Sequence, residues 1–511
     1  MTTSLRERLR DALSAPTLNW IDGQPLSLLI DGRSQPGHAE EIVDVIDPGS
    51  GLTIASAPAA RADDVDAAVG AARTAFDDGR WSEKDADERE AVLHTLVGLM
   101  QRHHRTLTEL ESLDTGKPLD QASEDVDEAI AVLGYFAGWA NKAEGTVVPA
   151  PRRFFAATVR EPIGVCAAIT PWNYPLPILM YKLAPALAFG NTTVIKPSEL
   201  ASLSTVYLAN LVAEAGVPDG VVNVVIGGGT VGQHLAGHPD VDKIGFTGST
   251  RTGQSIMRSA ADSLKKLGLE LGGKSAHIVF SDADLTSAAD AVLGGIWTNS
   301  GQLCVAGSRL LVQDTIHDEF VAELARRTGD LVIGHGMLDQ PDIGPVISRD
   351  QRDRIESLLA TAVFQGAEPI TGPPIPQNNG FYVSPTILTD VRRGSTIAQE
   401  EVFGPVLSVL PFTDERDAIA VANDTSFGLA AGVWSRDIGR IHRVARRVQA
   451  GTVWANTYGI FHHTVPFGGM KSSGLGRELG SAAVEHYTQL KSLVLDISND
   501  HAAAETEPGD K

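Results

Sequence analysis

Apolar and polar positions along the chain follow two periods, which together predict a protein of mixed helices and strands. Apolar residues three and four positions apart predict helices through residues 61–139, and again from about Pro177 and over 201–215. Residues 17–60 alternate short β-like runs, Leu28–Ile30 and Ile42–Ile46, with Gly and Pro turns. Further short apolar runs stand among the helices that follow, and they are Val165–Thr170, Thr193–Lys196, Val221–Ile226 and Ile244–Phe246. Strands that alternate with helices are typical of βαβ units, so the pattern predicts a parallel sheet covered by helices.

A second α/β series begins near Leu267 and continues past Pro466. Residues 146–160 form a separate β-like stretch with two prolines. Near the C-terminus the run Q-L-K-S-L-V-L-D-I-S alternates apolar and polar positions, as an edge strand does. An exposed edge strand offers unpaired backbone groups and therefore needs a partner. Residues 499–511 are small, polar and charged, which predicts a disordered tail.

Composition narrows the class of protein. A chain of 511 residues is expected to form two or three domains, and a net charge of −22 argues against a general nucleic-acid binder. No apolar run reaches the roughly 18 residues that a membrane span needs, so we expect no membrane partner. Two cysteines cannot form a disulfide framework, and no secretory signal is evident, which predicts a cytoplasmic protein.

One of the two cysteines is a candidate nucleophile. Cys304 lies at the centre of the glycine-lined stretch N-S-G-Q-L-C-V-A-G-S-R, residues 299–309. The thiolate is the nucleophilic form, and it is available near neutral pH only where the surroundings favour the charge. Such a group needs a base and an oxyanion site elsewhere in the chain. The other cysteine, Cys166, lies in G-V-C-A-A-I-T and is interpreted as a small buried hydrophobe.

Two segments offer the base and the oxyanion donor. Glu270 stands between two leucines in L-E-L-G-G-K, where apolar flanks would raise its pKa toward the range of a general base. The alternative is an exposed carboxylate at a strand edge. Asn173, in P-W-N-Y-P-L-P, could place its side-chain N–H beside the backbone N–H of Cys304 to form an oxyanion hole. The alternative is an ordinary turn residue.

A nucleotide site is indicated where a predicted strand ends in V-I-K-P-S-E, with Lys196 and Glu199. Ligands of open α/β sheets bind at the carboxyl ends of the strands. A carboxylate there can accept hydrogen bonds from a ribose diol and would repel a 2′-phosphate. The alternative is a helix cap, with Ser198 as the N-cap and Glu199 in the first turn.

Two glycine motifs compete for the phosphates. Residues 227–232, G-G-G-T-V-G, match G-x-G-x-x-G, but a lone match of this kind is weak. The run F-T-G-S-T-R-T-G, 246–253, places backbone amides and Ser249 at a predicted helix N-terminus, which is a natural anion site. The run E-E-V-F-G-P, 400–405, and the glycine-dense loop from Pro466 read as ordinary turns when each is taken alone.

Taken together, these segments resemble the NAD(P)-dependent, non-acylating aldehyde dehydrogenase superfamily. The motifs P-W-N-Y-P, K-P-S-E, F-T-G-S, L-E-L-G-G-K, G-Q-L-C, E-E-V-F-G-P and P-F-G-G-M-K-x-S-G occur in the family's order and at its spacing, over roughly residues 20–497. The resemblance implies an α/β fold with a Rossmann-like cofactor domain, an α/β catalytic domain and a small β oligomerisation arm. The implied boundaries are 1–142 and 161–271 for NAD binding, 272–487 for catalysis, and 143–160 with 488–498 for the arm.

The resemblance also implies residue roles. Cys304 resembles the nucleophile, Glu270 the base for deacylation and Asn173 the oxyanion donor, while Lys182 and Glu478 are similar to a pair that relays protons from the base. The positions similar to cofactor ligands are Thr170, Trp172, Lys196, Glu199, Gly229, Phe246, Ser249, Glu401 and Phe403. The family's phosphate contact comes from the 246–249 turn, so the resemblance demotes the 227–232 motif.

Family topology implies a substrate pocket walled by Tyr174, Tyr181, Trp297 or Thr298, Phe461 and Phe467. Such a wall suits an apolar aldehyde, or a cation attracted by the aromatic faces. Asp125 and Glu128 share one face of a predicted helix, and betaine- and amino-aldehyde dehydrogenases look similar at these positions. The alternative is a solvated acidic face. His462 and His463 are interpreted as pocket-rim or surface residues.

The resulting expectation is NAD-dependent oxidation of betaine aldehyde or an amino-aldehyde to its acid, with NADP as the second choice of cofactor. A broad aliphatic or aromatic aldehyde dehydrogenase is the alternative. A catalytically silent structural or binding member of the fold is the alternative from another class. A homo-oligomer, dimer or tetramer, and no metal site complete the expectation.

Overall fold

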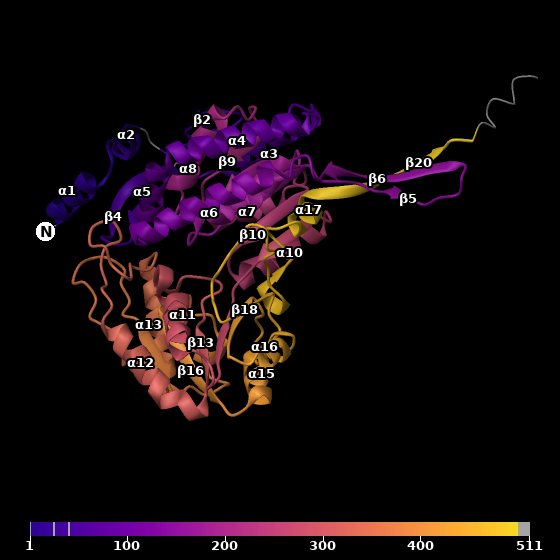
Figure 1. Ribbon diagram of the computed structural model, residues 1–511. Helices are drawn as coiled ribbons and strands as arrows, with labels where there is room; N and C mark the ends of the chain where they lie inside the picture. Colours follow the sequence, from indigo (N-terminus) through magenta and orange to yellow (C-terminus); the bar gives the residue numbers. More distant parts are fainter. Residues whose placement is uncertain (1, 24–25, 39–40, 499–511) are drawn as a thin grey trace, which may run out of the picture.

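The computed structural model describes residues 2–23, 26–38 and 41–498. Figure 1 shows two α/β bodies, one indigo to magenta and one orange, and a long arm that leaves the first of them. The segment 499–511, for which the sequence predicts a disordered tail, lies outside the described residues. No helix among the described residues is long and apolar enough to cross a membrane.

The first body is built on an eight-stranded sheet in the order β19-β11-β10-β7-β8-β9-β1-β2. Its strands are β1 (Leu28–Ile30), β2 (Arg33–Gln35), β7 (Val165–Ile169), β8 (Thr192–Lys196), β9 (Val222–Val224), β10 (Lys243–Thr247), β11 (Lys266–Glu270) and β19 (Gly474–Leu475). The run from β11 to β9 pairs in parallel, which confirms the predicted parallel sheet. The carboxyl ends of these strands therefore meet at one edge.

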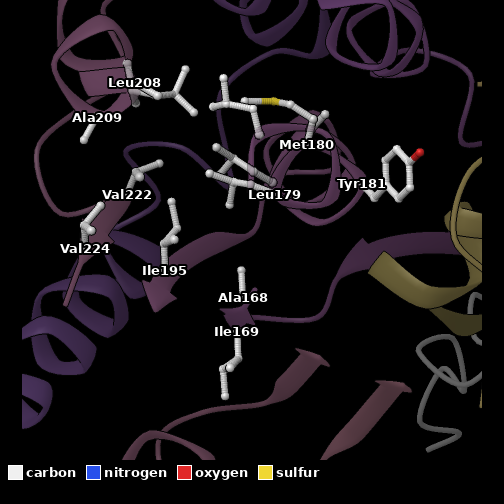
Figure 2. Packing of buried hydrophobic residues seen from close by; sticks show 14 of the residues in the cluster. Ala168, Ile169, Leu179, Met180, Tyr181, Ile195, Leu208, Ala209, Val222 and Val224 are labelled. Carbon is white, nitrogen blue, oxygen red and sulfur yellow. The ribbon is translucent and has the colours of Figure 1, made fainter. Parts of the chain in front are cut away.

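Helices cover both faces of this sheet. They are α3 (Ala62–Asp77), α4 (Ala86–Arg102), α5 (His104–Thr115), α6 (Leu119–Ala137), α7 (Pro175–Ala188), α8 (Leu203–Glu214), α9 (Gly229–Gly237) and α10 (Thr250–Ala261). Every residue of α7 is buried, because α6 packs on one side and β7 and β8 on the other. Tyr174, the N-cap before the helix, is partly buried. Figure 2 shows Leu179 and Met180 of α7 above Ala168 and Ile195 of the sheet. This packing fixes the turn that precedes α7.

The second body is built on a seven-stranded sheet in the order β14-β15-β16-β13-β12-β17-β18. Its strands are β12 (Ala276–Val279), β13 (Arg309–Gln313), β14 (Glu368–Thr371), β15 (Thr386–Thr389), β16 (Val406–Phe412), β17 (Ala430–Trp434) and β18 (Thr452–Ala455). Its helices are α11 (Leu285–Trp297), η1 (Thr298–Gly301), η2 (Asp314–Ile316), α12 (His317–Gly329), α13 (Arg349–Phe364), α14 (Thr396–Gln399), α15 (Glu415–Asn423) and α16 (Ile438–Ala445). The predicted start of this series near Leu267 is wrong, since β11 belongs to the first sheet.

The chain returns to the first body near its end. In β19, Leu475 pairs with Leu269 and Gly474 with Glu270, after a short turn η3 (Lys471–Ser473). The helix that follows, α17 (Ala482–Tyr487), packs against α7. This return lies within the range 272–487 that the sequence assigned to the catalytic domain.

The arm is a three-stranded antiparallel sheet of β5 (Val147–Val148), β6 (Phe154–Pro162) and β20 (Thr488–Asp496). Figure 1 shows the yellow β20 alongside β6, both leaving the first body near α17 and extending away from it. Apolar side chains stand exposed on this arm, among them Val147, Leu490, Val494 and Leu495. The alternating run near the C-terminus is therefore the strand β20, which pairs with β6 and leaves apolar side chains exposed. The three strands lie in the segments for which the sequence predicts an arm.

The N-terminal segment differs from the sequence prediction of short β-like runs over residues 17–60. Two helices, α1 (Thr2–Ala12) and α2 (Ala15–Gly23), come first, and the β structure begins only at Leu28. Pro16 lies in the first turn of α2, where a missing N–H costs nothing. A hairpin of β3 (Ile42–Asp47) and β4 (Leu52–Pro58) follows.

The buried His277 of β12 should make the stability of the fold sensitive to acid. Its side chain is fully buried, and burial lowers its pKa to about 3, far below the value of 6.5 for a free imidazole. The unfolded chain therefore binds more protons than the folded chain as the pH falls from 6.5 toward 3. Relative to neutral pH, this group should remove roughly 2 kcal/mol of stability at about pH 5. His277→Asn should flatten this part of the curve of unfolding free energy against pH, and an unchanged slope would contradict the assignment.

Candidate active site

A cavity of about 520 Å³ opens where β10 and β11 end and the second body begins. The residues that line it include Trp172, Asn173, Ser249, Glu270, Cys304, Glu401 and Phe403. The fold thus brings together segments that are more than two hundred positions apart in the sequence. The proposed nucleophile, base and oxyanion donor all face one space.

Cys304 lies on a loop that follows η1 and is only partly buried. Burial raises the pKa of its thiol to about 12, and the carboxylates of Glu401 and Glu270 add to the rise. Gly273 lets this loop approach β11 closely, since a side-chain carbon there would lie 2.2 Å from the Cys304 carbonyl oxygen. A neutral thiol therefore needs a proton acceptor before it can react.

The Asn173 amide is directed at the cysteine loop. The side chain is buried, and Nδ2 donates a hydrogen bond of 2.8 Å to the carbonyl oxygen of Gln302. An amide carries two N–H donors, so one remains for a second acceptor in the cavity. The alternative of an ordinary turn residue does not account for a buried amide held against the segment that carries Cys304.

Glu270 ends β11 at the cavity. This strand lies between β10 and β19, so the alternative of an exposed edge carboxylate is wrong. The side chain is 4% exposed, and among the described residues its Oε2 atom has no hydrogen-bond partner. Burial raises the pKa of Glu270 well above its usual value; Glu478 raises it further, and Lys182 and Arg477 oppose the rise. A carboxyl with a raised pKa is suited to proton transfer near neutral pH.

Lys182 and Glu478 form a buried pair behind the base. The Lys182 ammonium lies 2.8 Å from Glu478 Oε1 and donates to Thr247 Oγ1 at 2.7 Å. Lys182 comes from α7 and Glu478 from the segment after β19, so the late return of the chain completes this pair. The two residues that the family resemblance linked are in contact.

A second cavity, of about 850 Å³, continues from the first along the ends of the parallel strands. Its lining includes Thr170, Trp172, Lys196, Glu199, Gly229, Phe246 and Ser249, all named from the sequence. Lys196 Nζ lies 3.7 Å from Glu199 Oε2. The alternative of a helix cap is wrong, because α8 begins at Leu203 with Ser202 as its N-cap. Glu199 is therefore available to a ligand.

Helix N-termini face the middle of this trough. Ser249 is the N-cap of α10, and its Oγ accepts a hydrogen bond of 3.2 Å from the N–H of Thr252. Gly229 is the first residue of α9, with open space where a side chain would stand. The remaining N–H groups of a helix N-terminus favour a phosphate. Arg251, which the sequence analysis did not single out, lines both cavities.

In the first cavity, which the trough joins, Glu401 Oε1 accepts a hydrogen bond of 2.8 Å from the Gly273 N–H. Burial raises the pKa of Glu401 to about 7. Phe403 packs edge-on against Trp172, with ring centroids 5.3 Å apart, and its φ of 57° is strained for a bulky residue. A carboxylate at each end and amides between them fit a dinucleotide with two riboses and a pyrophosphate.

The aromatic wall is only partly as the sequence predicts. Phe461 packs edge-on against Phe467 at 5.2 Å, and both belong with Tyr181 and Cys304 to one cluster of the first body. Trp297 is 4% exposed and packs in a different core, between β12, β13 and α11 of the second body. The assignment of Trp297 to the pocket wall is therefore corrected, because its side chain packs in this core and not beside Phe461 and Phe467.

The acidic pair on α6 is also corrected. Asp125 is buried and forms an ion pair with Lys117, and Glu128 accepts a hydrogen bond from the Tyr181 hydroxyl. Burial raises the pKa of Asp125 against the lowering effect of the Lys117 ammonium, and burial also raises the pKa of Glu128. Asp125 therefore offers no free charge at a tunnel mouth. The alternative of a solvated acidic face is also wrong for Asp125, because its side chain is buried and paired with Lys117.

His462 is exposed, while His463 is half-buried against the Tyr135 ring, with centroids 5.0 Å apart. The two imidazoles stack at 4.1 Å. Among residues 2–23, 26–38 and 41–498, no group of three His, Cys, Asp or Glu side chains is placed to hold a metal ion.

A parallel sheet with a ligand trough at its carboxyl ends, joined to a partly buried cysteine and a buried carboxylate, is the arrangement expected of a nucleotide-dependent oxidoreductase. The "Aldehyde dehydrogenase family" profile matches residues 35–493, so the chain belongs to the aldehyde dehydrogenase family. The betaine aldehyde dehydrogenase of Bacillus subtilis is 45% identical over 91% of this chain and 96% of its own length.

Two further relatives extend the comparison. "Aldehyde dehydrogenase [NAD(P)+] 1" of Saccharomyces cerevisiae is 44% identical over 96% of this chain and 99% of its own length. The crystal structure of betaine aldehyde dehydrogenase from Staphylococcus aureus in complex with NAD+ has a TM-score of 0.93 and 37% identity. It covers 96% of this chain and 99% of that chain. The names cover both specific and general aldehyde dehydrogenases.

Proposed function

We propose that this enzyme oxidises an aldehyde to the carboxylic acid with NAD, through a thioester on Cys304. The observation that carries the proposal is the convergence of Cys304, the Asn173 amide and the buried Glu270 carboxyl on one cavity. That cavity continues into a trough that fits a dinucleotide. The shared family and the NAD+ complex of the Staphylococcus aureus relative support the reading.

The first step forms a covalent bond to sulfur. Cys304 gives its proton to water, Sγ attacks the aldehyde carbon, and the carbonyl electrons move to oxygen as an oxyanion. The Asn173 Nδ2–H and the Cys304 backbone N–H stabilise this charge. NAD, when bound, accepts hydride from the same carbon. Phe403 and Trp172 line the same cavity as Cys304.

The second step releases the acid. Glu270 takes a proton from water, the resulting hydroxide attacks the thioester carbon, and the Cys304 thiolate leaves. Lys182 and Glu478 lie behind Glu270 in a position to carry its proton away. We propose that the first body is the NAD-binding domain and that the second body is the catalytic domain, which supplies Cys304.

NAD is the proposed cofactor, and Glu199 is expected to set the preference over NADP. Its carboxylate lines the trough beside Lys196, where a 2′-phosphate would meet negative charge. Glu199→Gln should narrow the preference in kcat/KM for NAD over NADP by about tenfold, the effect of roughly 1.4 kcal/mol. Measurement of kcat/KM for both cofactors tests this. A preference that is unchanged in the variant would assign the discrimination to another residue.

Betaine aldehyde or an amino-aldehyde is the proposed substrate. The names of the Bacillus subtilis and Staphylococcus aureus relatives support it, and so do the aromatic rings of Tyr174 and Tyr181, which could face a cation. A broad aliphatic or aromatic aldehyde is the second candidate. The Lys117–Asp125 ion pair favours that candidate, because it removes one acid that was expected to attract a cation.

A matched pair of aldehydes separates these candidates. Betaine aldehyde and 3,3-dimethylbutanal have the same shape and differ by the positive charge. If the pocket recognises a cation, kcat/KM should favour betaine aldehyde by at least about tenfold, given ~2 kcal/mol for a desolvated cation on an aromatic face. Equal or better kcat/KM for the neutral aldehyde, with hexanal and benzaldehyde as further probes, would establish the broad enzyme instead.

We propose that the chain forms a homo-oligomer through its arm. The exposed apolar side chains of β20 and the open edge of this small sheet support the proposal. We also propose a reducing compartment, the cytoplasm, because both cysteines are free and the nucleophile must keep its thiol.

A further inference from the structure

Lys117 lies between α5 and α6, and its side chain has no exposure to solvent. A buried ammonium is costly unless it is paired and hydrogen-bonded. The contacts of Lys117 therefore indicate what this charge does. Most of them are with the turn that carries Asn173.

The Lys117 ammonium has three partners that match its three N–H donors. It forms an ion pair with Asp125 of α6, and it donates a hydrogen bond of 2.9 Å to the backbone carbonyl oxygen of Asn173. It also lies 4.0 Å from the ring centroid of Tyr174, the next residue in the chain. Two of the three partners thus belong to the turn before α7.

A second donor holds the same carbonyl from the opposite segment. Asn299 Nδ2 lies 3.0 Å from the Asn173 carbonyl oxygen, and Asn299 is buried with a φ of 46°. The backbone N–H of Asn299 donates in turn to Gln121 Oε1 of α6, at 2.9 Å. The peptide of Asn173 is clamped between α6 and the loop that leads to Cys304.

We propose that Lys117, assisted by Asn299, is a positioning residue for the oxyanion hole, an inference that rests on the proposed role of Asn173. With its carbonyl fixed and one Nδ2 hydrogen on Gln302, Asn173 has one orientation left for its second N–H. Preorganised donors stabilise an oxyanion because they need not reorient during the reaction. Asp125 keeps the ammonium in place and balances its charge.

Lys117→Met keeps the aliphatic stem and removes the charge and the donors. A displacement of the order of 1 Å at a reacting centre can cost about 100-fold, so we expect kcat/KM for the aldehyde to fall by about that factor. The rate at which iodoacetamide alkylates Cys304 should stay the same, because that reaction develops no oxyanion. Affinity for NAD, measured by calorimetry, should also be unchanged.

Lys265→Met is the matched control. Lys265 is likewise buried and donates to two backbone carbonyls, of His238 at 2.7 Å and Val241 at 2.9 Å. It lies at the amino ends of the strands, opposite the cavity, because β11 begins at the next residue and ends at Glu270. Loss of this ammonium should lower the melting temperature without lowering kcat/KM.

A double-mutant cycle with Asn173→Ala tests the inference most directly. Once the Asn173 amide is gone, Lys117→Met has nothing to position and should cost little more, so the two effects should be strongly non-additive. Asn299→Asp, which is isosteric and lacks the Nδ2 donor, gives an independent cycle with the same expectation if Lys117→Met does not fold.

The outcomes separate the inference from the function on which it rests. An equal loss from Lys117→Met in both backgrounds would overturn the positioning role, as would a parallel loss of Cys304 alkylation. Unchanged turnover in Asn173→Ala alone would instead remove the proposed oxyanion donor. A wild-type protein that forms no NADH from any aldehyde would overturn the proposed function itself.

Discussion

Cys304→Ala is expected to abolish NADH formation from every aldehyde that the wild-type enzyme oxidises. Without the sulfur no covalent adduct can form, and loss of a nucleophile costs at least about 10³-fold in comparable enzymes. Absorbance of NADH under saturating NAD measures the loss. Activity that survives this change would overturn the proposed mechanism, because it would mean that Cys304 is not the nucleophile.

Cys166→Ala is the matched control, because it removes the other free thiol of the chain. Cys166 is buried beside α17 and α7, with a pKa that burial raises to about 12. It should be inert to iodoacetamide, and its loss should leave turnover unchanged. Cys304, whose raised pKa makes it a neutral thiol, should be alkylated faster as the pH rises, by about tenfold per unit.

A catalytically silent member of the fold would behave differently in the same experiment. Such a protein would bind NAD in the trough without forming NADH, and Cys304→Ala would change nothing. The buried Glu270 carboxyl, whose Oε2 has no hydrogen-bond partner among the described residues, opposes this alternative, because an unpaired buried oxygen is costly to stability.

The sequence predicts the parallel sheet well because its strands are continuous buried apolar runs bounded by turns. Val165–Thr170 and Thr193–Lys196 coincide with β7 and β8 to within one residue. Residues at the ends of such strands meet at one edge by geometry, and so Lys196 and Glu199 were found from their position after a predicted strand, while Glu270 was found from its apolar flanks. Cys304 and Asn173 needed the resemblance as well, since neither follows from periodicity.

The errors arise where tertiary contacts decide. The i, i+3 spacing of Asp125 and Glu128 indicates one helix face, but it does not show that Lys117 reaches Asp125 across the turn before α6. Trp297 ends a helix whose next residues, Asn299 and Ser300, take positive φ angles, so the helical period fails there. The two-residue β19 is too short to give any periodic signal.

Glu270→Gln is expected to separate the two chemical steps. Hydride transfer does not need the carboxylate, so one NADH per active site should form in a burst with a rate near that of wild type. Hydrolysis of the thioester should then stall by about 10² to 10⁴-fold, the usual contribution of a general base. Stopped-flow absorbance gives the burst, and mass spectrometry should find the acyl group on Cys304.

The pH dependence of steady turnover in the wild-type enzyme should reflect the protonation of Glu270. Burial and Glu478 raise the Glu270 pKa, and a base acts only when deprotonated, so steady turnover should fall as the pH drops through a value above the normal glutamate range. In Glu270→Gln this acidic limb should disappear from the residual rate. Unchanged steady turnover in the variant would mean that another group activates water. Among the cavity-lining carboxyls, Glu401, with a pKa raised to about 7, would then be the residue to replace next.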